Sequence, residues 1–168
     1  MSENRIGLHV YTLRQFKSRE KNKTPIKFSQ HPRGGMLSSV VKKFITDFAD
    51  PSEDGAALLR DWYFSPRNSQ GFVHQGLIMY GSSGFAGDIV NKKTHEVRLK
   101  REVLDMDVIP LYYRFWIPDS GDFALAGFQT FGLRSCISKS FTRLQDTYRK
   151  NCEGYHIEAR AVVLTDIK

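Results

Sequence analysis

Lysine and arginine side chains gather in two segments of this sequence, and clustered cations are the groups with which proteins bind phosphate. The first segment surrounds a polar turn, and strand alternation places Arg98 and Lys100 on one face there, with Val97 and Leu99 turned inward. The second segment is the polar side of a helix further along the chain. Together they predict a polyanion-binding surface. The candidate nucleic-acid-binding residues are Lys92, Lys93, Arg98, Lys100, Arg101, Arg134, Lys139 and Arg143.

Aromatic residues near these cations favour the same interpretation. Tyr112 and Trp116 are expected to share one face of a strand with Arg114, and exposed rings beside basic side chains stack on bases. The pattern is equally that of a solvated basic surface over an aromatic core, and the sequence leaves both interpretations open. An alternative basic surface lies in an N-terminal loop that contains Arg14, Lys17, Arg19, Lys21 and Lys23.

The junction between a strand and a helix at Gly132 is a second candidate anion site. Arg134 and Ser135 follow the glycine, and the free N–H groups of a helix N-terminus attract anions. The ordinary alternative is that Ser135 caps the helix. Cys136 lies in the same turn, but no histidine is placed to act as its base, so a small buried side chain is the expected role.

Catalytic patterns are incomplete. Asp88, Glu96 and Lys100 resemble the two carboxylates and lysine of metal-dependent nucleases, but Arg98 stands where the acid-x-lysine element needs a lysine. The glycine-rich stretch at residues 81–87 lacks the lysine of a phosphate-binding loop and predicts a hairpin loop or bulge. The sequence therefore nominates no catalytic residue, no metal ligand and no cofactor.

Composition limits the class of protein. The 168 residues fit one domain, and 40% hydrophobic residues with twelve Phe and seven Tyr are enough for a core. With 25 basic against 18 acidic residues, the net charge of +7 favours polyanionic partners, nucleic acid before an anionic membrane. The two cysteines do not match zinc or disulfide frameworks. No signal peptide and no apolar run of about 20 residues is evident, so we expect a cytoplasmic protein without membrane contact.

Apolar periodicity predicts the elements of the N-terminal half. Ile6, Leu8 and Val10 alternate with other residues in the period-two pattern of a half-buried strand, whereas from Leu37 to Phe48 the apolar residues recur at helical spacing. In order, we expect a strand at 5–13, an exposed basic loop or the end of a long hairpin at 14–27, an amphipathic helix at 36–50, a shorter helix at 52–64 and a loop at 65–71.

The C-terminal half is predicted to be rich in strands. A hairpin at residues 109–131 is apolar on both faces and is therefore expected at the centre of a sheet. The whole chain, 1–168, predicts a single α+β domain, with a mainly antiparallel sheet and two main helices packed on it. The other expected elements are strands near 73–80, 88–90, 96–103 and 155–164, a turn at 91–94 and a helix at 133–150.

The segment at residues 108–144 combines an apolar strand, a short polar turn, a strand ending in a Phe-Gly pair and a helix. It resembles a segment of uncharacterised bacterial proteins linked to phage defence of the abortive-infection type. This resemblance implies a defence setting and no catalytic residues.

A non-enzymatic module that binds or senses nucleic acid, DNA or RNA, in bacterial phage defence or a phage counterpart is the leading hypothesis. The first alternative is a protein–protein interaction subunit of a defence complex, or a homo-oligomer, because aromatic residues anchor interfaces. The second alternative is a toxin-like metal-dependent nuclease.

Overall fold

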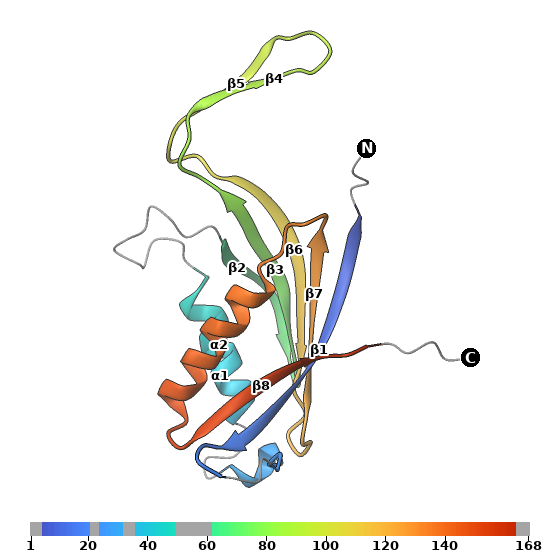
Figure 1. The fold of residues 1–168 in the computed structure, drawn as a ribbon, viewed down its shortest axis with the longest axis vertical. Coiled ribbons are helices and arrows are strands. Elements are labelled where there is room, and N and C mark those ends of the chain that lie inside the picture. The colour runs from blue at the N-terminus through green and yellow to red at the C-terminus, as the bar shows by residue number, and fades with distance from the viewer. Residues whose placement is uncertain (1–4, 21–23, 32–35, 50–61, 164–168) are drawn as a thin grey trace, which may run out of the picture.

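A six-stranded antiparallel sheet forms the body of the protein (Figure 1). The computed structural model describes residues 5–20, 24–31, 36–49 and 62–163. The strand order is β2-β3-β6-β7-β1-β8, so the hairpin predicted to be central does lie in the middle of the sheet. The strands are β1 (Ile6–Lys17), β2 (Trp62–Gln70), β3 (Val73–Ser82), β6 (Asp107–Trp116), β7 (Ala124–Phe131) and β8 (Tyr155–Ala161).

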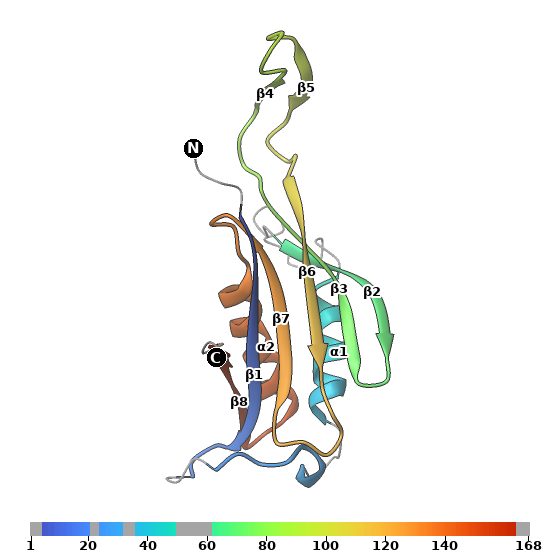
Figure 2. The same cartoon turned by 90° about the vertical axis from the view of Figure 1, so that its right-hand side faces the viewer.

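Two helices, α1 (Met36–Asp47) and α2 (Ile137–Asn151), lie on the same side of this sheet, and no helix among the described residues covers its other face, which we call the uncovered face (Figures 1 and 2). A short 3₁₀ helix, η1 (Phe28–Gln30), follows β1. The predicted fold class, a mainly antiparallel α+β structure with two helices on the sheet, is confirmed. In the part of the chain that the structure describes, no helix is both long and apolar enough to cross a bilayer.

Aromatic rings fill the space between the helices and the sheet. Phe44 of α1 meets Phe64 of β2 edge to face at 5.0 Å, and Phe64 meets Tyr113 of β6 at 4.9 Å. Phe115 continues the chain of rings to Phe128 of β7, with ring centres 5.6 Å apart. All five side chains are fully buried, and edge-to-face ring pairs add to the stabilisation that burial itself provides.

Strands β4 (Gly87–Val90) and β5 (Val97–Arg101) form a separate two-stranded ribbon that projects from the ends of β3 and β6 (Figures 1 and 2). The expectation that Val97 and Leu99 turn inward is wrong, because the ribbon has no core behind it and both side chains are more than half exposed. The predicted turn is confirmed, since Asn91 Oδ1 accepts hydrogen bonds from the backbone N–H groups of Lys93 and Thr94.

Strand β1 is longer than predicted. It runs on to Lys17 through the segment expected to be an exposed loop or the end of a long hairpin, and Gln15 and Phe16 are buried there. The Gln15 side chain donates to the Lys27 carbonyl at 2.9 Å and accepts from Tyr148 Oη at 3.0 Å. These bonds satisfy a buried amide, so a polar residue can lie inside the sheet layer.

The region of the shorter predicted helix, residues 52–64, lies mostly outside the described residues. Its last three residues, Trp62 to Phe64, begin β2 and are therefore strand rather than helix. The predicted loop at 65–71 is also wrong up to Gln70, because β2 pairs along this length with β3.

Two buried tyrosines differ in how their hydroxyls are satisfied. Tyr148 Oη donates to Gln15 Oε1, whereas Tyr113 Oη has no hydrogen-bond partner among the described residues. Burial raises the pKa of both phenols, so each hydroxyl keeps its proton. A buried polar group without a partner costs about 1–3 kcal/mol relative to a satisfied one.

Replacing each tyrosine by phenylalanine is expected to change stability in opposite directions. Tyr113→Phe removes an unsatisfied hydroxyl and should leave the free energy of unfolding unchanged or raise it by up to about 1 kcal/mol. Tyr148→Phe leaves Gln15 Oε1 buried without its donor and should lower that free energy by about 1–2 kcal/mol. Urea unfolding of both variants measures the difference, and equal losses in the two would contradict this account.

Candidate nucleic-acid interface

The uncovered face of the sheet carries Tyr112, Arg114 and Trp116 in a row along β6. The intervening residues Tyr113 and Phe115 point to the helices and are fully buried, because successive side chains of a strand alternate between faces. Tyr112 and Trp116 are 37% and 38% exposed, so part of each ring is open to solvent. We call Tyr112, Arg114 and Trp116 the β6 row.

Strand register places apolar residues beside the β6 row. Trp116 lies opposite Leu125 of β7, and Arg114 lies opposite Gly127, which in turn pairs with Val10 of β1. Gly127 has no side chain to fill the space beside Arg114. The result is a groove with a volume of about 470 Å³. Its lining residues are Leu8, Val10, Tyr112, Arg114, Trp116, Leu125 and Gly127.

Hydrogen bonds hold Tyr112 in place. Its hydroxyl donates to Gln75 Oε1 at 2.7 Å, and its backbone N–H donates to Gln129 Oε1 at 3.0 Å. The Gln129 side chain satisfies the backbone N–H of Tyr112 in place of a β7 carbonyl, because the pairing of β6 with β7 extends only from Tyr113 to Trp116 and Tyr112 lies just beyond it. A ring fixed in this way loses little conformational freedom when a ligand stacks on it.

Arg114 contributes a positive charge at the middle of the β6 row. No carboxylate in the described part of the chain forms an ion pair with it. Its guanidinium is planar, remains charged at any relevant pH and can hydrogen-bond a phosphate with two N–H groups at once. The groove therefore combines two flat rings with one cation that is available to an anionic ligand.

The basic residues of the ribbon are exposed, with one exception. Lys92 and Lys93 lie on the turn, and Arg98 and Lys100 lie on β5, where Lys100 pairs with Asp88 of β4. The register between β4 and β5 shifts at Arg98, so the expected alternation is interrupted there, and Asp88 lowers the net charge around Lys100. We call Lys92, Lys93, Arg98 and Lys100 the ribbon cations.

Arg101 is the exception, because it is only 9% exposed. Its guanidinium lies 3.8 Å from the centre of the Phe85 ring and donates to the backbone carbonyls of Ser82 and Asp105. These contacts bind the base of the ribbon together. Arg101 thus has a structural role, and we leave it out of the proposed contact surface.

The junction before α2 differs from the expected anion site. Phe131 and Arg134 exchange backbone hydrogen bonds around Gly132, whose φ of 57° favours glycine. Helix α2 begins only at Ile137, so Arg134 lies before its first turn and forms an ion pair with Asp107 at 3.6 Å. The N-cap of α2 is Cys136 rather than Ser135, so the capping alternative is wrong as well, although Ser135 Oγ accepts from the N–H of Ile137 at 3.3 Å.

The remaining predicted cations lie on the helix side, away from the β6 row. Lys139 stands 5.9 Å from the centre of the Tyr80 ring, and Arg143 stands at the same distance from the Phe48 ring. Arg143 also lines a groove between α1 and α2 in which acidic residues Asp47 and Asp146 accompany the basic ones. The structure therefore does not bring the eight predicted residues into one surface.

The alternative nuclease residues are not arranged for a shared cation. Asp88 pairs with Lys100, whereas Glu96 lies level with Asn91, about three residues or about 10 Å further along the ribbon. The Glu96 carboxylate accepts a hydrogen bond from Thr94 Oγ1 instead. Among the described residues no three His, Cys, Asp or Glu side chains are grouped to hold a metal ion, and Cys136 is buried.

The sequence singled out the two rings and placed Arg114 on their face of the strand, but it did not predict Arg114 as a binding residue and did not show what surrounds the row. Leu8, Val10 and Gly127 come from β1 and β7, and only strand register shows that they adjoin the β6 row. No local signal in the sequence marks them. No family model, curated protein or solved structure matches the chain.

Proposed function

We propose that this protein binds single-stranded nucleic acid on the uncovered face of its sheet. The observation that carries the proposal is the β6 row, two partly exposed rings with an unpaired arginine between them on a face that no helix in the described part of the chain covers. Stacking of a base on an aromatic side chain contributes about 1–3 kcal/mol, and a positive charge between the rings attracts the phosphate that joins two bases. The defence setting rests on the resemblance of residues 108–144 alone.

Single strands fit this surface better than duplexes do. Tyr112 and Trp116 are four residues apart, about 13 Å along the strand, so each ring serves a different base. In a duplex the base faces are already stacked and are closed to such rings, whereas unpaired bases can turn outward. The ribbon cations then add phosphate contacts that do not depend on base identity.

Tryptophan fluorescence provides a direct test. The chain has two tryptophans, and Trp62 is buried in the core while Trp116 lies on the proposed surface. Titration with single-stranded DNA and RNA should quench Trp116 emission, more strongly at low than at moderate salt, and Trp116→Phe should remove most of the response. If neither single-stranded nor duplex oligonucleotides bind at low salt, the proposal is wrong.

Removing the ribbon cations is expected to weaken binding without harming the fold. The variant with Lys92, Lys93, Arg98 and Lys100 all changed to Gln should show a smaller salt dependence, by up to about 0.7 in the logarithmic slope for each phosphate that the protein no longer neutralises. Stability should change by about 0.5 kcal/mol or less per position because all four side chains are exposed. Anisotropy titrations at several salt concentrations measure the slope.

A matched control separates the ribbon from the loss of net charge. Four exposed lysines elsewhere, Lys27, Lys42, Lys43 and Lys150, can be changed to Gln with the same loss of four charges. If both quadruple variants reduce the slope equally, the ribbon has no special role and only the overall charge matters.

A protein partner is the second candidate for the same face. Ile6 and Leu8 on β1 are 67% and 70% exposed, and contiguous exposed apolar groups are typical of protein interaction sites. Light scattering and fluorescence together distinguish the candidates: a protein interface predicts no Trp116 quenching by oligonucleotides.

A further inference from the structure

Strand β8 ends the sheet on one side, and its outer edge has no neighbouring strand in the described part of the chain (Figure 2). Val162 N–H donates to the Val10 carbonyl, and the Gly154 carbonyl accepts from Ser18, so the even-numbered residues of β8 direct their backbone groups to β1. The backbone N–H and C=O groups of Ile157, Ala159 and Ala161 therefore point outward, because these groups alternate in direction along a strand.

The opposite edge of the sheet is protected in a way that β8 is not. Strand β2 contains Pro66, and its pairing with β3 is irregular between Pro66 and Asn68. Proline and bulges on edge strands prevent pairing with another chain. Strand β8 has neither proline nor an irregular register with β1.

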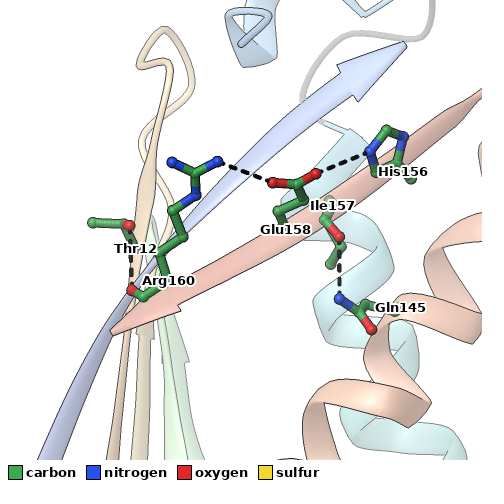
Figure 3. Close-up of polar contacts among 6 residues, drawn as sticks. All are labelled: Thr12, Gln145, His156, Ile157, Glu158 and Arg160. Atoms are coloured by element: carbon green, nitrogen blue, oxygen red, sulfur yellow. Dashed lines mark hydrogen bonds and ion pairs between the residues drawn. The ribbon is translucent and has the colours of Figure 1, made fainter. Parts of the chain in front are cut away.

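Charged side chains lie along the uncovered face of β8 (Figure 3). The Glu158 carboxylate lies 3.5 Å from His156 Nε2 on one side and 3.3 Å from the Arg160 guanidinium on the other. Arg160 is mostly exposed, so its guanidinium can also reach a group beyond the edge of the sheet. The strand thus carries a negative and a positive charge two residues apart on one face.

We propose that a second copy of this chain pairs with β8 in antiparallel orientation, with a two-fold axis at Ala159. In this register Ala159 faces Ala159 of the second copy, and Ile157 faces its Ala161, so the outward backbone groups of both strands bond one another. Glu158 then lies directly opposite Arg160 of the second copy, and the symmetry repeats this pair. The inference is independent of the proposed nucleic-acid function.

Charge complementarity selects this register over its neighbours. A two-fold axis at Glu158 would place two glutamates opposite each other, and an axis at Arg160 would place two arginines opposite each other, both of which destabilise a strand pair. An axis at Ile157 avoids like charges but pairs only residues 155–159, because β8 begins at Tyr155. The axis at Ala159 likewise pairs five residues of β8, 157–161, but Val162 and Val163 can continue the pairing beyond them, whereas the chain turns at Gly154, with a φ of 79°, directly before Tyr155.

Two further features fit the register at Ala159. Val162 and Val163 follow β8 with exposed side chains, and they would lie opposite His156 and Tyr155 of the second copy. Gln145 of α2 donates to the Ile157 carbonyl at 3.3 Å (Figure 3). A carbonyl oxygen has two lone pairs, so this bond leaves room for the partner strand's N–H group.

A charge exchange tests the register. The parent protein should sediment as a concentration-dependent dimer in the micromolar range. Glu158→Arg places two arginines opposite each other and Arg160→Glu places two glutamates opposite each other, each twice per dimer, so either variant should weaken dimerisation at least about tenfold. Equimolar mixing of the two variants restores opposite charges at both positions and should restore the dimer. Circular dichroism and thermal unfolding establish that each variant is folded.

The control is Asp119→Arg, which makes the same kind of charge reversal on the exposed β6–β7 loop and should dimerise like the parent. A parent protein that is monomeric at about 100 μM overturns the proposal. A dimer that tolerates both single variants, or a mixture that does not recover, overturns it as well, because the interface would then lie elsewhere.

Discussion

Changing both Tyr112 and Trp116 to alanine is expected to reduce the affinity for single-stranded oligonucleotides by about 30-fold or more. Each ring is expected to stack on one base, and removing one stacked ring costs about 1–3 kcal/mol, so removing two costs at least about 2 kcal/mol. The free energy of unfolding should change by much less than the free energy of binding, because both side chains lie on the uncovered face and are already partly exposed. Anisotropy with a labelled single strand measures the affinity.

The variant with Tyr112 and Trp116 both changed to phenylalanine is the matched control. It keeps two rings at the same positions and removes the polar atoms, including the hydroxyl that donates to Gln75. It should retain most of the affinity. Binding by the double alanine variant at the parental level would show that the oligonucleotide lies elsewhere, and the ribbon would then be the better candidate.

The two helices and the central hairpin could be predicted because their sequence patterns are strong and local. In α1 the apolar residues recur at helical spacing from Leu37 to Ile45, and these side chains are buried as expected. In β6 the alternation of Leu111, Tyr113 and Phe115 with exposed residues is unbroken. Where one side of a helix or strand is buried and the other is exposed, the spacing of the apolar residues identifies both the type of element and its buried side.

The N-terminal strand shows why period alone is insufficient. Ile6, Leu8 and Val10 form the apolar side of the predicted strand, but they lie on the face that the helices leave uncovered. The side that faces the helices includes Tyr11, whose ring packs on Phe141 of α2 at 4.8 Å. Both sides of β1 contain apolar residues, so the choice between them depends on helices that lie far along the chain.

Long-range polar contacts also escaped prediction. Gln15 lies among basic residues and locally favours a loop, but its partner Tyr148 is 133 residues away. Arg101 equally resembles the exposed ribbon cations, and only the fold shows that Phe85 and two carbonyls surround its guanidinium. Charge and periodicity identify which residues can do chemistry, whereas register and burial decide which of them are accessible.

Truncating an apolar side chain should therefore lower the free energy of unfolding strongly in the core between the helices and the sheet, and only slightly on the uncovered face. Phe44→Ala removes a fully buried ring that contacts Phe48, Trp62 and Phe64 and so joins α1 to β2. Removal of such a ring leaves a cavity and is expected to lower the free energy of unfolding by about 3–5 kcal/mol. Urea unfolding measures the change, and Phe44→Leu provides a smaller graded change if the alanine variant does not fold.

Leu8→Ala is the control on the opposite face. It removes an apolar side chain that is already mostly exposed and is expected to change the free energy of unfolding by about 0.5 kcal/mol or less. A loss of stability comparable to that of Phe44→Ala would mean that the uncovered face contributes to the core of the folded monomer. A small loss, together with weaker ligand binding, would show that apolar residues on this face serve recognition rather than stability, as the exposed groove beside Arg114 implies.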